Sequence, residues 1–324
     1  MGVLSNRSEA ELLSSREAER RSRKTLISSL VSFSLAFTGF FPLPASAIGT
    51  APCEQSTEYD SGVSIVQSGT FCYIAFKYVN EADGIQNNSW NNPSGVTQVD
   101  ALVVGGGGGR GSRHGGGGGA GAVLEFTNHP IPIAGINASV GRGGAGAVGA
   151  PTAYVGSKGF NSQFAGIRAL GGGAGVNGTT TDVNGGSGGG AGWNQTAGQP
   201  QSQAVSTLAG TNLGNFTGGF AGAPGAREED GTRDFWAGGG GGGAGAAGAQ
   251  ATANGTQTIA YANGQHTNAL GGAGGVGRAI SWITPAIATA LGVGHISGGQ
   301  VFFGGGGGGG IGADGVSGGP GGLG

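Results

Sequence analysis

The densest group of side chains capable of acid–base chemistry lies between residues 226 and 236. Its acidic members are Glu228, Glu229, Asp230 and Asp234. A pair of these carboxyl groups could serve as the general acid and general base of a hydrolase. Arg227 and Arg233 lie among them, a pattern typical of a solvated loop that neutralises its own charge. We therefore interpret the segment as a charged connector and expect no catalytic residue in it.

Several motifs match only because glycine is abundant. Ser187 and Ser317 both lie in a Gly-x-Ser-x-Gly pattern, but neither follows a predicted strand or precedes a predicted helix, as a nucleophile elbow requires. Residues 99–111 have the spacing of a dinucleotide fingerprint, yet a helix so rich in glycine would be strongly disfavoured. Residues 309–317 match one copy of a calcium-binding nonapeptide. Calcium sites of that kind form between several stacked copies of the repeat. The sequence predicts no enzyme, no cofactor and no calcium site.

Metal ligands are equally sparse. The four histidines, His114, His129, His266 and His295, are scattered without the spacing of a metal site. The two cysteines, Cys53 and Cys72, are an even pair downstream of a segment typical of export, which favours a disulfide worth about 3 kcal/mol. We expect no metal.

The first 47 residues have the three parts of a secretory signal. A basic region ends at Lys24, an apolar region covers residues 26–41, and Ala45-Ser46-Ala47 fits a cleavage site. A membrane anchor is the alternative, but serines and a threonine interrupt the apolar region. Without these residues the chain carries 9 basic and 13 acidic residues, a net charge of −4, which disfavours nucleic acid as a partner. The expected protein is secreted or at the cell surface, with no membrane insertion after cleavage.

Strand patterns dominate the next part of the chain. Residues 70–79 alternate at period two, and residues 63–66 can pair with them through the turn at Ser68-Gly69. Further predicted strands cover residues 97–104, 122–126, 131–140 and 166–170. The only predicted helix is 285–291, with Thr284 as its cap, Pro285 at its first position and Gly292 after its end. The sequence predicts a mainly β protein with an antiparallel, β-sandwich-like framework and long connecting loops.

Glycine makes up 80 of the 324 residues and is concentrated in blocks. These blocks cover residues 105–109, 115–119, 185–190, 238–243 and 304–310. A seven-glycine run would lose about 7 kcal/mol as an α-helix relative to alanine, whereas the extended threefold helix has no such cost. Glycine helices of this kind can pack side by side and exchange main-chain hydrogen bonds. We predict a bundle of polyglycine-II helices over 171–324, joined to a β-rich framework over 48–170 in one continuous module.

Four segments carry a resemblance to a known family. They are 99–104 with the glycines after it, 115–124, 138–144, and 160–164 with 169–173. Together they resemble bacterial secreted and phage-encoded glycine-rich domain proteins, from about Val63 to the C-terminus. The chain is similar in this respect to glycine-rich phage tail-fibre adhesins and to the glycine-rich extracellular region of the anaplastic lymphoma kinase family. In the adhesins the bundle is a rigid scaffold whose loops touch the host receptor, which implies a similar scaffold here.

Aromatic side chains in the polar connectors are the candidate binding residues. They are Trp90, Trp193, Trp236, Tyr261 and Trp282. Exposed aromatics commonly anchor recognition, including stacking on sugars, but the same residues could instead cap the bundle and shield its backbone. The first hypothesis is an adhesin that binds a cell-surface glycan or a protein receptor. The alternatives are a passive structural component of the envelope or matrix that associates with itself, and a hydrolase with its site in the 226–236 connector.

Overall fold

The computed structural model describes most of the chain beyond the predicted signal. The described residues are 53, 62–79, 84–90, 92, 95–132, 135–148, 155–177, 182–192, 196–206, 212–229, 234–252, 258–261, 264–267, 270–311 and 318–324. The predicted signal lies outside this set. Contacts group residues 51–324 into one unit, which is the unit described below.

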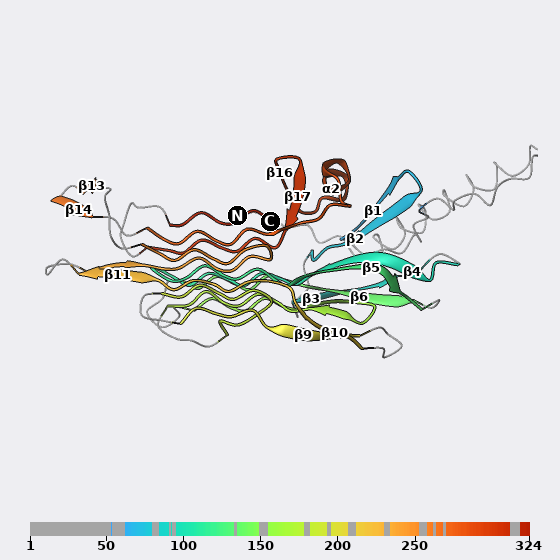
Figure 1. Cartoon of the computed structure of the whole chain (residues 1–324), viewed down its shortest axis with the longest axis horizontal. Coiled ribbons are helices and arrows are strands. Elements are labelled where there is room, and N and C mark those ends of the chain that lie inside the picture. The colour runs from blue at the N-terminus through green and yellow to red at the C-terminus, as the bar shows by residue number, and fades with distance from the viewer. Residues whose placement is uncertain are drawn as a thin grey trace, which may run out of the picture. The chain divides into compact units, whose positions relative to one another are not determined.

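Antiparallel strands in small sheets form the side-chain-packed part of this unit (Figure 1). The strands of this part are β1 (Val63–Ser68), β2 (Phe71–Phe76), β3 (Ile85–Trp90), β4 (Gln98–Val104), β5 (Val123–Pro130), β6 (Ile136–Gly141), β7 (Ser162–Phe164), β8 (Ile167–Ala169), β9 (Ser202–Ser206), β10 (Asn212–Thr217), β15 (Arg278–Ala279), β16 (His295–Ser297) and β17 (Gln300–Phe303). They form the sheets β1-β2, β3-β6-β7-β8, β4-β5, β9-β10 and β15-β17-β16. The prediction of a mainly β fold with little helix is confirmed.

The helix α2 (Pro285–Leu291) begins and ends where the sequence predicts. The side chain of Thr284 accepts a hydrogen bond from the amide of Ile287, Pro285 opens the first turn, and Gly292 ends the helix with φ 66°. Ile287, Ala288 and Leu291 point into a core with Ile280 and Val301, and β1, β2, β4 and β5 pack around it. The helix is therefore held by its apolar face as well as by its caps.

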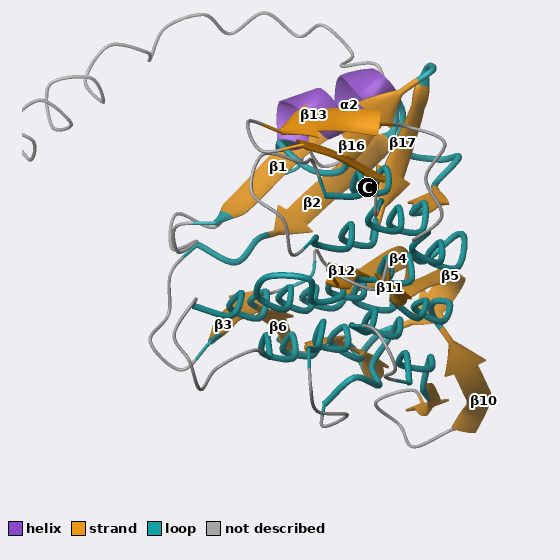
Figure 2. Ribbon diagram, turned by 90° about the vertical axis from the view of Figure 1, so that its left-hand side faces the viewer, coloured by secondary structure: helices purple, strands orange, loops and turns teal. Residues whose placement is uncertain are grey.

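The glycine-rich segments are extended and lie side by side, as Figure 2 shows with these segments seen nearly end-on. We call each segment a rod and name it by its residue numbers. In rod 238–244, successive amides donate to three different neighbours, and every third amide returns to the same one. Its donor bonds are 2.7 to 3.0 Å long. This repeat of three is the signature of the threefold helix, so the predicted lateral hydrogen bonding is confirmed.

Rod 238–244 has six neighbours, three that accept from its amides and three that donate to its carbonyls. They are rods 304–310, 185–191 and 246–249 as acceptors, and rods 271–276, 116–122 and 220–223 as donors. Each amide and carbonyl from Gly238 to Gly243 thus has a main-chain partner. The rods together form a hexagonally packed lattice in which most buried peptide groups are satisfied without side chains.

The rods run back and forth between two ends. Rod 105–111 leaves β4 and rod 116–122 enters β5, so the turn between them lies away from those strands. Gly238 donates to Gly310, and Gly310 donates to Gly115, which places the start of rod 238–244 beside that turn. We call this the far end. The end that adjoins α2 and the strands given above is the framework end (Figure 1).

Two further hairpins lie at the far end. They are β11 (Ala226–Glu229) with β12 (Asp234–Ala237), and β13 (Thr258–Tyr261) with β14 (Gly264–Thr267). The first leads directly into rod 238–244, and the second is flanked by the bridge between Thr252 and Leu270. Figure 1 shows β11, β13 and β14 together at this end. The sequence indicated only connectors or short strands here.

Candidate functional site

The five candidate aromatics do not share one location. Trp90, in β3, is 6% exposed and packs with Ile131 and Ile136 at the framework end. Trp282 also lies there, partly buried against the α2 core, with its ring stacked on Tyr73 at 6.4 Å. Core packing accounts for both tryptophans, so neither is part of the site considered below.

A polar bridge fixes the position of Trp282. Its Nε1 donates to Oε1 of Glu125 at 2.8 Å, while Oε2 of Glu125 receives a bond from Arg278 at 2.8 Å. Glu125 belongs to β5 and Arg278 to β15, so the bridge connects two sheets of the framework. These contacts give Trp282 a structural role.

Two of the other three candidates, Trp236 and Tyr261, belong to the far end. Trp236 lies in β12, opposite Arg227 of β11, and is half-buried. Tyr261 ends β13. Trp193 lies outside the described residues and follows Gly192, the last described residue of the rod that runs toward this end. The back-and-forth course of the rods thus brings connectors from distant parts of the sequence to one end.

Trp236 is held by a histidine from the turn after the first rod. The rings of His114 and Trp236 meet edge to face with centroids 4.6 Å apart. His114 is 6% exposed, and a hydrogen bond joins its side chain to Asn177. The turn itself is tight, because Arg113 adopts φ 53° and Gly115 donates to the carbonyl of Ser112 at 2.9 Å. Three separate connectors therefore meet around one imidazole.

The environment of His114 favours its neutral form. Burial lowers the pKa of His114 below its ordinary value of 6.5, and the guanidinium of Arg113 lowers it further. The hydrogen bond to Asn177 acts in the opposite direction. A neutral imidazole packs against the indole of Trp236 and keeps the aromatic surface uncharged.

His114 is the residue of this site that sequence reasoning missed, since it was grouped with the scattered histidines. A signal was present, because Ser112-Arg113-His114 is the longest interruption between the glycine blocks 105–109 and 115–119. Such an interruption marks a turn between two rods. The aromatic partner of His114 comes from residue 236, and nothing in the spacing indicates that contact.

The acidic cluster is only partly described. Glu228 and Glu229 lie in β11 and Asp234 lies in β12. In the register of this hairpin, the backbone of Glu229 lies opposite that of Asp234. Asp230 and Arg233 lie outside the described residues. Among the residues that the structure describes, no group of three or more histidine, cysteine, aspartate or glutamate side chains could hold a metal ion.

Ser187, the nucleophile-elbow candidate, lies inside the lattice. It is completely buried in rod 185–191, and its amide donates to Ala120 of a neighbouring rod. No substrate reaches a side chain in that position, which agrees with the interpretation of this motif as accidental. Ser317 lies outside the described residues.

The remaining histidines are separate from one another. His129 is buried in the framework, with Nε2 2.8 Å from the carbonyl oxygen of Ala165. His295 is exposed in β16, and His266 lies in β14 at the far end. Their distribution gives no common site.

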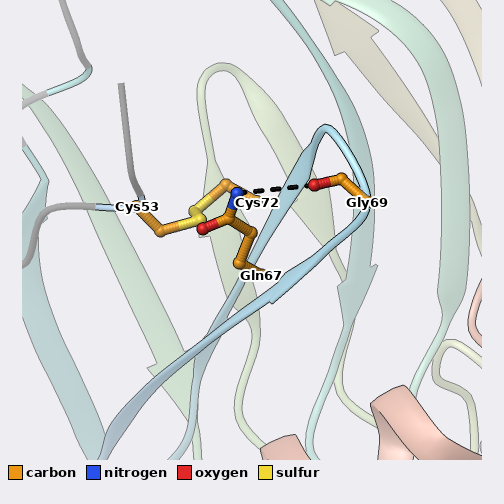
Figure 3. Close-up of a disulfide and its surroundings, with 4 residues drawn as sticks. All are labelled: Cys53, Gln67, Gly69 and Cys72. Atoms are coloured by element: carbon orange, nitrogen blue, oxygen red, sulfur yellow. Dashed lines mark hydrogen bonds between the residues drawn. A yellow bond between two sulfur atoms is a disulfide. The ribbon is translucent and has the colours of Figure 1, made fainter. Parts of the chain in front are cut away.

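The predicted disulfide is present between Cys53 and Cys72 (Figure 3). Cys72 lies in β2, and the neighbouring turn is closed by a hydrogen bond from the side-chain amide of Gln67 to the carbonyl of Gly69. The disulfide ties the segment before β1 to the β1-β2 hairpin. It lies apart from the aromatic residues of the far end.

No helix in the described part of the chain has the length and apolar character needed to cross a membrane.

Comparison with known proteins supports the family suggested by the glycine pattern. Neither the curated proteins nor the solved structures include a match to the chain. A family model described as "Glycine-rich domain" matches residues 82–324, from just before β3 through the last rod. The chain belongs to the glycine-rich domain family.

Proposed function

We propose that this protein is an exported, non-enzymatic scaffold that presents recognition loops at the far end of its rod lattice. The observation that carries the proposal is the convergence of connectors there. The turn at 112–115, the β11-β12 hairpin and the β13-β14 hairpin are separated widely in sequence, yet the rods deliver them to one end. Two of the five candidate aromatics, Trp236 and Tyr261, lie in those hairpins.

The lattice suits this task because each rod is hydrogen-bonded to several neighbours, and every third residue bonds the same neighbour. Loops on a rigid support lose less conformational freedom on binding than loops on a flexible one. Aromatic side chains then supply contact area at low entropic cost, and an indole or phenol can stack on a sugar ring. The partner is a cell-surface glycan or a protein receptor.

Substitution of the far-end aromatics Trp236 and Tyr261, together with the candidate Trp193, tests this function. A chain with Trp193→Ala, Trp236→Ala and Tyr261→Ala is compared with wild type for binding to a glycan array and to a panel of cells. Loss of hot-spot aromatics costs about 2 kcal/mol or more each, so binding is expected to disappear. The matched control is Phe71→Ala, which removes an aromatic side chain that is 66% exposed in β2 at the framework end.

Two outcomes of the binding experiment would count against this function. Retained binding by the triple variant would contradict the far-end site. Absence of any ligand for the wild-type chain would favour a passive structural component instead. Since Trp236 packs on His114, a Trp236→Phe variant that keeps an aromatic contact separates loss of binding from loss of folding, which thermal unfolding would report.

Export is the second part of the proposal and has its own test. The signal-like segment ending at Ala47 and the disulfide both fit an oxidising compartment outside the cytoplasm. The N-terminal sequence of the protein recovered outside the cells is expected to begin at Ile48. Recovery of the intact chain from the cytoplasm alone would contradict export.

A further inference from the structure

The positive charges of this chain are concentrated in one part of its sequence. Residues 101–181 carry five basic residues and one acidic residue, a net charge of +4. The rest of residues 48–324 carries four basic and twelve acidic residues, a net charge of −8. The acidic residue of the basic segment, Glu125, already has partners, because it bonds Arg278 and Trp282. A negatively charged chain therefore has one region that attracts anions.

Four of the five basic residues lie along one edge of the rod lattice. We call this set the basic edge, and its members are Arg110, Arg142, Lys158 and Arg168. Rod 142–147 forms the edge, since among the described rods it is bonded only to 105–111 and 155–160. One cation belongs to each of these three rods, and the fourth lies in β8, in the sheet that β6 and β7 join to the rods. The three arginines are exposed.

Backbone pairing places the four cations at successive levels along one course of chain, β6 and the rod that follows it. Arg168 lies at the level of Ser139, because both pair with Gln163 of β7. Arg142 lies three residues further along, and Arg110 lies at the level of residue 147, whose amide donates to its carbonyl. Lys158 lies between them, since its neighbours in the rod bond the carbonyls of residues 142 and 145. From residue 139 to residue 147 the chain extends about 25 Å, at ~3.1 to 3.3 Å per residue.

The charges of the basic edge are not neutralised within the chain. Among the residues that the structure describes, no carboxylate pairs with any of the three arginines. The guanidinium of Arg142 lies over the ring of Phe160, 5.2 Å from its centroid, which orients the cation and leaves its charge in place. Nζ of Lys158 donates to the neutral Oε1 of Gln201 at 3.2 Å. An anion can therefore approach these groups without displacing an internal one.

The edge rod provides a floor of small residues between the cations. Gly143, Ala145 and Gly146 are exposed. Cγ of Arg110 lies 3.6 Å from the position that a Cβ atom would take at Gly146. The side chain of Arg110 therefore lies over the same rod that Arg142 begins. The part of the floor between residues 142 and 146 is about 12 Å long.

Polar side chains continue the basic edge onto the adjoining sheet. In β3, β6, β7 and β8 the exposed residues are Asn87, Ser89, Asn137, Gln163 and Arg168. They share one face, because residues that alternate with them, such as Trp90 and Ile136, are buried in a core. Amide and hydroxyl groups can bond the hydroxyls of a sugar. The same face lacks the apolar centre that protein interfaces commonly have.

We propose that the basic edge binds an acidic polysaccharide, a linear sugar polymer with carboxylate groups, lying along rod 142–147 and the exposed face of β6. Guanidinium groups bind carboxylates through two parallel hydrogen bonds, and the polar face serves the sugar hydroxyls. Nucleic acid suits the edge less well, because duplex DNA carries one charge per ~1.7 Å whereas four cations are spread here over about 25 Å. This site is separate from the aromatic residues of the far end.

Binding of the purified chain to polygalacturonate, measured by titration calorimetry with neutral dextran as the comparison polymer, tests this proposal. Wild type is expected to bind polygalacturonate alone, and more weakly as salt is added. Gly143→Asp adds a carboxylate to the floor and should weaken binding about fivefold. The matched control is Gly143→Asn, which has the same size and no charge and should bind like wild type. A Cβ atom at Gly143 has its nearest contact at 3.5 Å, so both variants should keep the thermal midpoint of wild type.

A second variant removes the charges themselves. Exposed ion pairs are individually weak, so Arg110→Gln, Arg142→Gln and Arg168→Gln together should weaken binding at least about tenfold. Lysine at the same three positions keeps the charge and should retain most of the affinity.

Three outcomes would overturn the proposal. One is a wild-type chain that does not bind polygalacturonate at low salt, and another is equal binding by the Gly143→Asp and Gly143→Asn variants. The third is binding of polyglutamate or duplex DNA as tightly as polygalacturonate, which would assign the edge to an acidic protein or to nucleic acid. The far-end variant with Trp193→Ala, Trp236→Ala and Tyr261→Ala keeps the basic edge and should bind polygalacturonate like wild type. The two proposals therefore fail separately.

Discussion

The framework end and the rod lattice bury their polypeptide by different means. At the framework end, Ile280, Ile287 and Val301 form a side-chain core beneath small antiparallel sheets. In the lattice the buried groups are the peptide units, and most of them are satisfied by a neighbouring rod. The first arrangement depends on the hydrophobic effect and the second on close approach of backbones. Comparison of the two shows that a chain with 80 glycines among 324 residues can fold without a large apolar core.

The largest expected effect comes from a side chain placed inside the lattice. Gly241→Val puts a branched side chain where even a Cβ meets the backbone oxygen of Gly118. The rods must separate and lose several ladder bonds, so we expect destabilisation of more than about 4 kcal/mol. Chemical denaturation of the purified chain measures this loss.

The matched control for Gly241→Val is Gly143→Ala, at an exposed glycine in rod 142–147 at the edge of the lattice. Its Cβ has only ordinary contacts, so the change in unfolding free energy should stay within about 0.5 kcal/mol. Equal destabilisation by the two substitutions would mean that intrinsic conformational preference, and not close approach, is what glycine contributes. That result would remove the basis of the comparison.

A smaller effect is expected from the side-chain core. Ile280 is 2% exposed and packs against α2, so Ile280→Ala should cost about 2 to 5 kcal/mol. Its amide also donates to Val301 in β17, the strand that leads into rod 304–310. The two regions are therefore connected through one strand.

Amide hydrogen exchange of the Ile280→Ala variant tests whether the framework and the rod lattice unfold together. If the framework and the lattice unfold as one cooperative unit, protection of the rod amides falls by the same free energy as that of the framework amides. Loss of protection in the framework alone would show that the lattice is independently stable. Thr289→Ala, an exposed change in the same helix, is the control.

Local signals in the sequence were sufficient where one short segment decides the structure. The turn after Ser68 joins β1 and β2 as predicted, and Thr284, Pro285 and Gly292 define α2. The predicted strand 131–140 is shorter in the structure, where β6 begins at Ile136. Pro132 has no amide to donate, which disfavours a ladder before that point.

Sequence reasoning could not supply the arrangement of the rods or the far-end site. One glycine block has the same chemistry as another, so nothing in residues 238–243 indicates six particular neighbours. The strand β3 was missed because Ile85–Trp90 is mostly polar and lacks an apolar alternation. The contact of His114 with Trp236 depends on rod order, and rod order is a property of the whole fold.

The smallest expected effect is a pH dependence at the far end. Since burial lowers the pKa of His114 in the folded chain, the unfolded chain binds a proton more readily. The stability that neutral His114 contributes is complete above pH 6.5, its ordinary pKa, and is lost as the pH falls below that value toward the folded pKa. The thermal midpoint should therefore fall on acidification. A His114→Phe variant keeps a ring against Trp236 but does not titrate, so its midpoint should change less over the same range. Identical pH profiles for the two chains would show that the imidazole is not held neutral by the lattice, and that the far end is more open to water than the rods that lead to it.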